Sequence, residues 1–209
     1  MLIDRKLLYI YMICCEQVFF KLRQLNSLFK VNTEMNELIE KAKKIKCLIC
    51  DVDGVLTDGL LYVDNFGNEL KAFHVQDGMG LKLLMAAGIE VAIITTSVNA
   101  VIDHRMKQLG ILHYYTGQVD KRDAFAQLKQ RLGFDYTEFA YVGDDLPDLP
   151  IIQQVGLGVA VANAVPQVKE FAIWQTEQTG GRGAVREVCE LILNAQNKQE
   201  IALTRYLIS

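Results

Sequence analysis

From about Lys46 onward, short apolar runs alternate with longer segments in which apolar residues recur at helical spacing. The short runs lack the polar alternation of a half-exposed strand, which is typical of parallel strands covered on both faces. We expect strands at residues 46–51, 91–96, 113–116, 139–144 and 157–162. We expect helices at residues 77–88, 97–110, 121–133 and 146–156, each of which ends at or near a glycine. This alternation predicts an α/β fold with a doubly wound parallel sheet.

Residues 60–75 interrupt the alternation. Two strand-like runs there flank the sequence Asp64-Asn65-Phe66-Gly67-Asn68, and Gly67 can take the positive φ that a tight turn needs. We therefore expect a β-hairpin. It follows the first strand at its carboxyl end, where open α/β sheets build their binding sites, so we expect it to form a flap over a site.

The first 34 residues differ from the rest of the chain. The apolar run from Leu7 to Cys15 is far shorter than the roughly twenty residues needed to cross a bilayer. No small-residue cleavage site of a signal peptide follows it. We expect residues 1–34 to be an extension outside the fold, residues 35–197 to form one domain, and residues 198–209 to form a tail. We also expect no membrane partner and a cytoplasmic location.

Composition narrows the class of protein. The chain has 209 residues, 51% of them apolar, which is enough for one domain with a core and argues against disorder. Its formal net charge of -3 gives no basic excess, so we expect no nucleic-acid partner. Cys47 and Cys50 have the spacing of a redox pair, but residues three apart on a strand point to opposite faces. We expect core thiols in a reducing compartment.

Two carboxylates follow the first predicted strand. Asp51 and Asp53 stand one residue apart, directly after the buried run, and Gly54 comes next. Paired carboxylates at such a position are costly unless a cation balances them, and a divalent cation with oxygen ligands does this well. The simpler alternative is a polar turn with two solvated aspartates. The buried run before the pair and the glycines after it count against that alternative.

A second acidic cluster, Gly143-Asp144-Asp145 with Asp148, ends a later strand. Because parallel strands point their carboxyl ends the same way, both clusters should meet at one edge of the sheet. Hard oxygen ligands favour magnesium over zinc, and no set of Cys and His residues has zinc spacing. The sequence therefore predicts a Mg²⁺ site.

Thr95 ends another predicted strand, and Lys121 opens the helix after the next one. A hydroxyl and an ammonium at these places can face a phosphoryl group. We expect Asp51 to attack phosphorus and form an aspartyl-phosphate. We expect Asp53 to protonate the leaving oxygen and then to deprotonate the water that hydrolyses the intermediate. Mg²⁺, Lys121 and Thr95 would stabilise the charge on the phosphoryl oxygens.

These residues resemble the four motifs of the haloacid dehalogenase superfamily of phosphatases: DVDGVLTDG at 51–59, Thr95, Lys121 and GDDLPD at 143–148. The resemblance covers about residues 35–197, including the hairpin and the segment GGRGAVRE at 180–187. It implies a Mg²⁺-dependent phosphomonoesterase that is a homotetramer without a separate cap domain. It also implies that Asp51, the backbone carbonyl of Asp53, and Asp144 hold the metal. Only about forty residues separate Asp51 from Thr95, which independently leaves no room for a cap.

Within the superfamily, the chain is similar to members that hydrolyse 3-deoxy-D-manno-octulosonate 8-phosphate in lipopolysaccharide biosynthesis. The resemblance implies a small phosphorylated sugar acid as the substrate. It implies substrate contacts at Asp53, His74, Val75, Gln76, Asp77, Gly78, Lys82, Ser97, Arg105 and Lys121. It also implies that the glycine-rich segment closes the site of a neighbouring subunit, with Arg182 or Arg186 on the substrate carboxylate. A glycine loop that only leads into a helix is the alternative reading of this segment.

The chain departs from the usual pattern at three of these positions. The second motif usually reads Thr-Gly-Arg, whereas this chain has Thr95-Thr96-Ser97, and Gln76 and Lys82 stand where arginines are expected. Lysine can replace arginine as a point charge but not as a bidentate fork. These differences leave the phosphatase chemistry untouched. They favour either weaker affinity for the usual substrate or a different one, such as a sialic-acid-like 9-phosphate.

Two alternatives belong to other classes of protein. A signalling receiver domain is also doubly wound and is also phosphorylated on an aspartate, but it takes that aspartate from the third strand, whereas here the acid pair closes the first. A non-catalytic homologue would only bind or assemble, but all four chemical positions are filled here. Phosphate release from an aryl phosphate, compared with an Asp51→Asn variant, separates an enzyme from a binding protein.

Overall fold

All five apolar runs that the sequence predicts as buried strands are strands in the computed structural model, which describes residues 33–206. These five are β1 (Cys47–Cys50), β4 (Glu90–Ile94), β5 (His113–Tyr115), β6 (Phe139–Gly143) and β7 (Leu157–Ala160), and a sixth strand, β8 (Trp174–Gln175), joins them. They form one sheet in the order β5-β4-β1-β6-β7-β8, and every neighbouring pair is parallel. The predicted parallel α/β sheet is confirmed. Nearly all of the predicted extension, residues 1–34, lies outside the described residues.

The sequence pattern does not predict β8 or the helix before it, α6 (Pro166–Phe171). β8 pairs with β7 over only two residues at the edge of the sheet, which is too short to show a hydrophobic period. Trp174 of β8 is only partly buried but packs against the core cluster.

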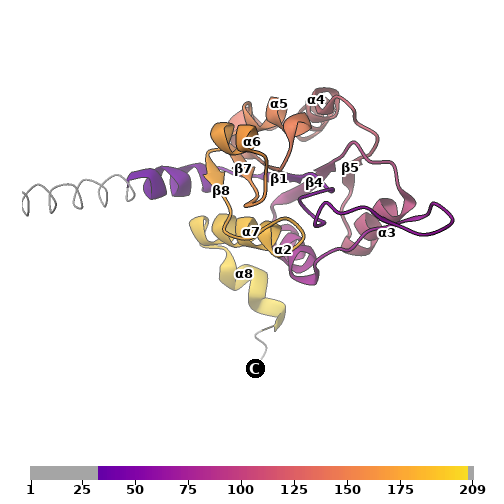
Figure 1. Cartoon of the computed structure of the whole chain (residues 1–209). Coiled ribbons are helices and arrows are strands. Elements are labelled where there is room, and N and C mark those ends of the chain that lie inside the picture. Colours follow the sequence, from indigo (N-terminus) through magenta and orange to yellow (C-terminus); the bar gives the residue numbers. More distant parts are fainter. Residues whose placement is uncertain (1–32, 207–209) are drawn as a thin grey trace, which may run out of the picture. The chain divides into compact units, whose positions relative to one another are not determined.

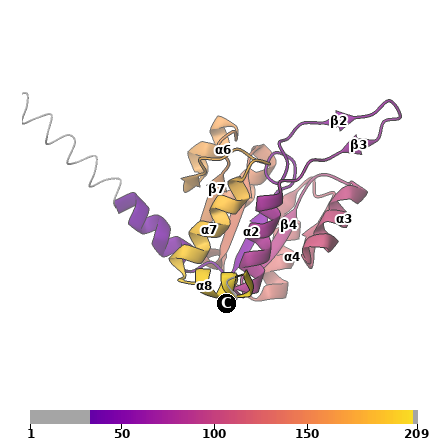
Figure 2. The same ribbon diagram turned by 90° about the horizontal axis from the view of Figure 1, so that it is seen from below.

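Helices cover both faces of the sheet (Figures 1 and 2). The longer ones are α2 (Val75–Ala86), α3 (Ala100–Leu109), α4 (Lys121–Leu132) and α7 (Ala184–Ala195). The shorter ones are α5 (Leu149–Ile152), α8 (Gln199–Leu203) and the 3-10 turns η1 (Tyr136–Glu138), η2 (Leu146–Asp148) and η3 (Thr204–Tyr206). In both views α2 and α7 lie side by side on one face. Figure 1 shows α4, α5 and α6 on the other face.

Glycines end two of the predicted helices as expected. Gly110 and Gly133 follow α3 and α4 in the left-handed conformation. The segment 146–156 differs from its prediction, because it divides into η2 and the four-residue α5. Pro150 lacks the amide hydrogen that a continuous helix from Leu146 would use at that position.

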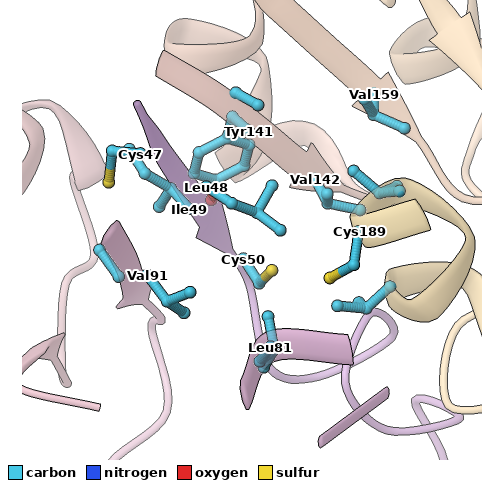
Figure 3. Packing of buried hydrophobic residues seen from close by; sticks show 14 of the residues in the cluster. Cys47, Leu48, Ile49, Cys50, Leu81, Val91, Tyr141, Val142, Val159 and Cys189 are labelled. Atoms are coloured by element: carbon cyan, nitrogen blue, oxygen red, sulfur yellow. The ribbon is translucent and has the colours of Figure 1, made fainter. Parts of the chain in front are cut away.

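The core is built around β1, whose four residues are all fully buried. Figure 3 shows Cys50 facing Cys189 of α7, with Cys47 on the other side of the strand. The three cysteines within the described residues are free and buried, and burial raises the pKa of each thiol. The expectation that these cysteines are core thiols is confirmed.

The expected hairpin is present. Strand β2 (Tyr62–Val63) pairs antiparallel with β3 (Glu69–Leu70), and Gly67 has a φ of 82°. Figure 2 shows the hairpin projecting away from the sheet and its helices. Its side chains are exposed, and Phe66 at the tip is 91% exposed.

The carboxyl end of the chain continues the packing. The described residues from Leu38 onward form one compact unit. Within that unit Ala202 of α8 is buried and Leu203 packs against the core, although both lie in the predicted tail. No helix among residues 33–206 is long and apolar enough to cross a membrane.

Candidate active site

Three strands place candidate residues at one edge of the sheet. β1 lies between β4 and β6, and its last residue, Cys50, is level with Ile93 and Val142. Asp51 therefore follows β1 beside the end of β4, which leads to Thr95, and the end of β6, which leads to Asp144. The strand alignment brings together the two acidic clusters that the sequence analysis expected to converge.

Carboxylate oxygens of Asp51, Asp144 and Asp148 all lie within 4.8 Å of one another. Oδ1 of Asp144 is buried and has no hydrogen-bond partner among the described residues. Burial, followed by the charge of Asp148, raises the pKa of Asp51 to about 7 and that of Asp144 to about 8. Neighbouring carboxylates, one of them with a buried oxygen that has no hydrogen-bond partner, provide the oxygen ligands that a hard divalent cation prefers.

Lys121, the first residue of α4, is the cation that the chain itself supplies. Its ammonium lies 3.0 Å from Oδ1 of Asp51 and 2.7 Å from Oδ1 of Asp148. It also lies 3.2 Å from the hydroxyl of Tyr141. Burial lowers the pKa of Lys121, but the attraction of the two carboxylates outweighs burial, so the pKa is raised. Lys121 therefore stays charged beside Asp51.

Asp148 organises the loop that carries Asp144. Oδ1 of Asp148 accepts a hydrogen bond from the Tyr141 hydroxyl at 2.6 Å. Oδ2 accepts the backbone N–H groups of Asp144 at 2.8 Å and Asp145 at 3.2 Å. A Cβ at Gly143 would overlap the Asp148 side chain, which explains the glycine at this position.

From the sequence, Asp148 was expected only as a member of the acidic cluster, and no role was predicted for Tyr141. The signals available were an aspartate four residues after Asp144 and a hydroxyl in an otherwise apolar strand.

The loop after β1 turns tightly around Val52. The carbonyl oxygen of Val52 accepts hydrogen bonds from Leu56 N at 2.9 Å and Thr57 N at 3.0 Å. Gly54 has a φ of 89°, and a Cβ there would overlap the carboxylate of Asp144. Gly54 thus permits both the turn and the close approach of the second acidic cluster.

Asp53 lies in this loop and meets a residue that the sequence analysis missed. The ammonium of Lys71 lies 2.5 Å from Oδ1 of Asp53, and the Lys71 side chain is only 5% exposed. Lys71 directly follows β3, at the base of the hairpin. No local pattern marks it, because it stands eighteen residues from its partner.

Thr95 is fully buried at the end of β4. Its backbone N–H donates to the carbonyl oxygen of Tyr115 at 3.0 Å, and its Oγ1 accepts from Ser97 N at 3.2 Å. These bonds hold the Thr95-Thr96-Ser97 turn in place at the end of the strand.

The glycine-rich segment packs against the loop of its own chain. Gly181 N donates to the carbonyl oxygen of Val55 at 2.9 Å, and Gly180 N donates to Oδ1 of Asn163 at 2.9 Å. A Cβ at Gly180 would overlap the carbonyl oxygen of Gly54. These contacts place the segment against the loop after β1 of its own chain, and the role that the resemblance implies for it at a neighbouring subunit stays a prediction.

Asp77, expected to contact the substrate, has its carboxylate turned inward. Its oxygens accept hydrogen bonds from Arg186 N at 2.8 Å and Gly183 N at 3.3 Å, and the side chain is 1% exposed. Burial raises the pKa of Asp77. The carboxylate holds the start of α7 against α2, because the amide groups of that helix end need acceptors.

The other expected substrate residues are spread over a wider area. Arg105 lies over the ring of Phe73 and close to Gly78, and it donates to Oε1 of Gln108 at 2.6 Å. His74 precedes α2, and its Nδ1 lies 3.8 Å from Oδ2 of Asp77. Val75 and Lys82 are exposed on α2.

Gln76 and Arg182 line a separate hollow of about 610 Å³. Its lining residues are Gln76, Glu177, Gln178, Arg182, Gly183, Arg186, Glu187 and Glu190. Arg182 also lies 3.6 Å from Oδ2 of Asp58. The hollow therefore holds arginines and glutamates, and none of the strand-end aspartates lines it.

Comparison with known proteins shows which family the chain resembles. The sequence profile of haloacid dehalogenase-like hydrolases matches residues 91–188. The 3-deoxy-D-manno-octulosonate 8-phosphate phosphatase KdsC of Yersinia pestis is 50% identical over 165 residues, which cover 79% of this chain and 88% of that protein.

Solved structures are similar as well. A hydrolase of the haloacid dehalogenase superfamily, subfamily III A, from Legionella pneumophila is 77% identical, with a TM-score of 0.84 over 86% of this chain and 98% of that one. A 3-deoxy-D-manno-octulosonate 8-phosphate phosphatase from Moraxella catarrhalis, in complex with magnesium, phosphate and KDO, is 47% identical. Its TM-score is 0.79 over 82% of this chain and 99% of that one.

Proposed function

The chain belongs to the haloacid dehalogenase-like hydrolases, in the family of 3-deoxy-D-manno-octulosonate 8-phosphate phosphatases, and on this premise we propose that it hydrolyses 3-deoxy-D-manno-octulosonate 8-phosphate. The products would be the free sugar acid and inorganic phosphate, in lipopolysaccharide biosynthesis. The observation that carries the proposal is the buried arrangement in which the Lys121 ammonium lies 3.0 Å from Asp51, beside Asp144. This arrangement presents a nucleophile, a cation and a metal site to one phosphoryl group.

Magnesium fits the residues present. The buried Oδ1 of Asp144 has no partner within the described part of the chain, and carboxylate oxygens of Asp51 and Asp144 lie within 4.8 Å of each other. We propose that Asp51, the backbone carbonyl of Asp53, and Asp144 hold the ion. Asp148 is already engaged by Lys121 and Tyr141. Bound Mg²⁺ would neutralise charge on the transferring phosphoryl oxygens.

In the first step a carboxylate oxygen of Asp51 forms a bond to phosphorus. The bond from phosphorus to the sugar oxygen breaks, and the carboxyl proton of Asp53 moves to that oxygen, which leaves as an alcohol. Asp51 then carries the phosphoryl group as an aspartyl-phosphate. Lys121 and Thr95 stabilise the phosphoryl oxygens during the transfer.

In the second step a water oxygen attacks the phosphorus of the aspartyl-phosphate. Asp53, now a carboxylate, takes a proton from this water. The bond between phosphorus and the Asp51 oxygen breaks, which releases inorganic phosphate and restores both aspartates to their starting forms.

The test is phosphate release from a panel of sugar-acid phosphates, with and without a chelator. We expect the octulosonate 8-phosphate to be hydrolysed fastest, the chelator to abolish activity, and Mg²⁺ to restore it. Asp51→Asn should be inactive while remaining folded. If the octulosonate ester is hydrolysed no faster than unrelated sugar phosphates, the proposed substrate is wrong.

A related substrate, a sialic-acid-like 9-phosphate, is the second candidate. It is favoured by the neutral residues Ser97 and Gln76 at positions where arginines are usual in phosphatases of this kind. A higher kcat/KM for that ester than for the octulosonate ester would select it.

We also propose that the protein is a cytoplasmic homotetramer. The three described cysteines are free thiols, which suits a reducing compartment. The hairpin exposes a run of apolar side chains that a second copy of the chain can cover: Leu60, Leu61, Tyr62, Val63, Phe66 and Leu70.

A further inference from the structure

Lys71 joins the hairpin to the loop after β1, which carries Asp51 and Asp53 and is called the catalytic loop below. Every residue from Gly59 to Leu70 is exposed, whereas the side chain of Lys71, at the end of this stretch, is 5% exposed. Its ammonium lies 2.5 Å from Oδ1 of Asp53. The hairpin thus makes a partly buried polar contact with Asp53, the residue that, in the proposed function, donates the proton.

The two aspartates of the loop are held in different ways. Asp51 is restrained twice, because its Oδ1 accepts from Val52 N at 2.7 Å and lies 3.0 Å from Lys121. Within the described residues, the carboxyl group of Asp53 has one hydrogen-bond partner, Lys71. The orientation of Asp53 therefore depends on a residue of the hairpin rather than on the sheet.

We propose that Lys71 is a positioning residue for proton transfer to the leaving oxygen. Its ammonium binds Oδ1 of Asp53, which leaves Oδ2 to carry the proton and turns that oxygen toward the substrate. Lys71 acts through Asp53 and forms no bond with the reacting atoms. The inference rests on the proposed function.

The same contact links proton transfer to the position of the hairpin. β2 and β3 pair over two residues only, and the turn between them is held by Asp64, which accepts from Phe66 N, Asn68 N and Asn68 Nδ2. The hairpin is attached to the rest of the chain through Asp58, which accepts from the Tyr62 hydroxyl at 2.9 Å, through Glu69, which accepts from Asn99 Nδ2 at 3.3 Å, and through Lys71. When the hairpin is in place, Asp53 is oriented; when it moves away, Asp53 loses its partner.

The leaving group provides the test, because only a poor leaving group needs a proton. The variants are Lys71→Met, which keeps the length of the side chain without its charge, and Lys71→Arg, which keeps the charge. Lys107→Met, on the exposed face of α3, is the matched control. The substrates are 3-deoxy-D-manno-octulosonate 8-phosphate, an alkyl ester, and p-nitrophenyl phosphate, whose leaving group departs as a stable anion. The measured quantity is kcat/KM, which reports the steps through cleavage of the ester bond.

We expect Lys71→Met to lower kcat/KM for the alkyl ester by about 10- to 100-fold, a part of what general acid catalysis contributes. The same variant should lower kcat/KM for p-nitrophenyl phosphate less than about threefold. Asp53→Asn should show the same selectivity more strongly, Lys71→Arg should recover most of the alkyl-ester activity, and Lys107→Met should match the wild type. An equal loss on both substrates, or no loss on either, overturns the proposal.

A failure of the proposed substrate is a separate outcome. If the wild type cleaves p-nitrophenyl phosphate but not the octulosonate ester, the proposed substrate is wrong. Glycerol 2-phosphate then replaces it as the alkyl ester, and the same selectivity decides the role of Lys71.

Discussion

The ammonium of Lys121 lies 2.7 Å from Oδ1 of Asp148, and both side chains are 1% exposed. The pair joins the start of α4 to η2, in the loop after β6. Because Asp148 also binds the backbone of Asp144, one buried ion pair sets the positions of both Lys121 and a carboxylate of the acidic cluster. The geometry around Asp51 therefore depends on Asp148, a residue that forms no bond with the phosphoryl group in the proposed mechanism.

Replacing Asp148 with alanine should destabilise the protein. The substitution leaves Lys121 buried with only one carboxylate, Asp51, as a counter-charge. Removing one partner of a buried pair costs about 3–5 kcal/mol, and we expect about 3 kcal/mol because Asp51 remains close. Urea denaturation in the presence of a chelator measures the loss. Glu170→Ala, at an exposed position in α6, is the control and should change the unfolding free energy by less than about 0.5 kcal/mol. Equal midpoints for the two variants would contradict the prediction.

Gly180→Ala should impair activity. The added Cβ overlaps the carbonyl oxygen of Gly54, so the glycine-rich segment must move away from the catalytic loop or displace it. A shift of about an ångström at a catalytic group can cost about 100-fold in rate, and we expect kcat/KM to fall by up to that factor. Gly88→Ala is the control, since its Cβ meets open space and its cost is the strain of a positive φ alone. Unchanged kcat/KM in Gly180→Ala would show that the segment does not support the loop.

The buried carboxyl of Asp77 should make stability depend on pH. Burial raises its pKa in the folded protein above the ordinary value of 3.8. The folded state then binds more protons than the unfolded state, so the contribution of Asp77 to the unfolding free energy falls as pH rises from about 3.8 to the folded pKa. Asp77→Asn should cost about 1–3 kcal/mol, because an amide N–H group replaces one acceptor.

The measurement for Asp77 is urea denaturation of the wild type and Asp77→Asn between pH 4 and 7, with Asp123→Asn as an exposed control. The stability difference between the wild type and Asp77→Asn should narrow as pH rises, while the control should run parallel to the wild type. A difference that widens with pH would mean that the pKa of Asp77 is lowered instead.

Charging the hairpin tip should weaken self-association. Leu61 and Phe66 are 73% and 91% exposed on the hairpin, and glutamates there would place like charges on the surface that the proposed tetramer would bury. We expect the double variant Leu61→Glu with Phe66→Glu to show a smaller mass by light scattering than a tetrameric wild type. A double change at Asn65 and Asn68 to serine, which keeps the tip neutral, is the control. A wild type that is monomeric at the same concentration would count against the proposed tetramer.

The chemical layout of the strand ends was predictable because it depends on local and periodic signals. Buried strands can be recognised in the sequence as apolar runs, and parallel strands place the residues that follow them at one edge of the sheet. Asp51, Thr95 and Asp144 could therefore be assigned to one edge of the sheet before any coordinates were known. The family motifs lie at the same strand ends, which is why the resemblance and the periodicity led to the same residues.

The partners of those residues were not predictable in the same way. Asp77 and Arg186 are 109 residues apart, Lys121 and Asp148 are 27 apart, and Asp53 and Lys71 are 18 apart. A hydrogen bond between residues far apart in the sequence produces no periodic pattern of residue types. Several charged residues could each be the partner, and the folded backbone decides which one is. The amino-acid sequence by itself determined the sheet, the edge at which the acids gather and the family. Only the tertiary structure decided which buried charge neutralises which, because that choice depends on distances in space that the order of residues does not contain.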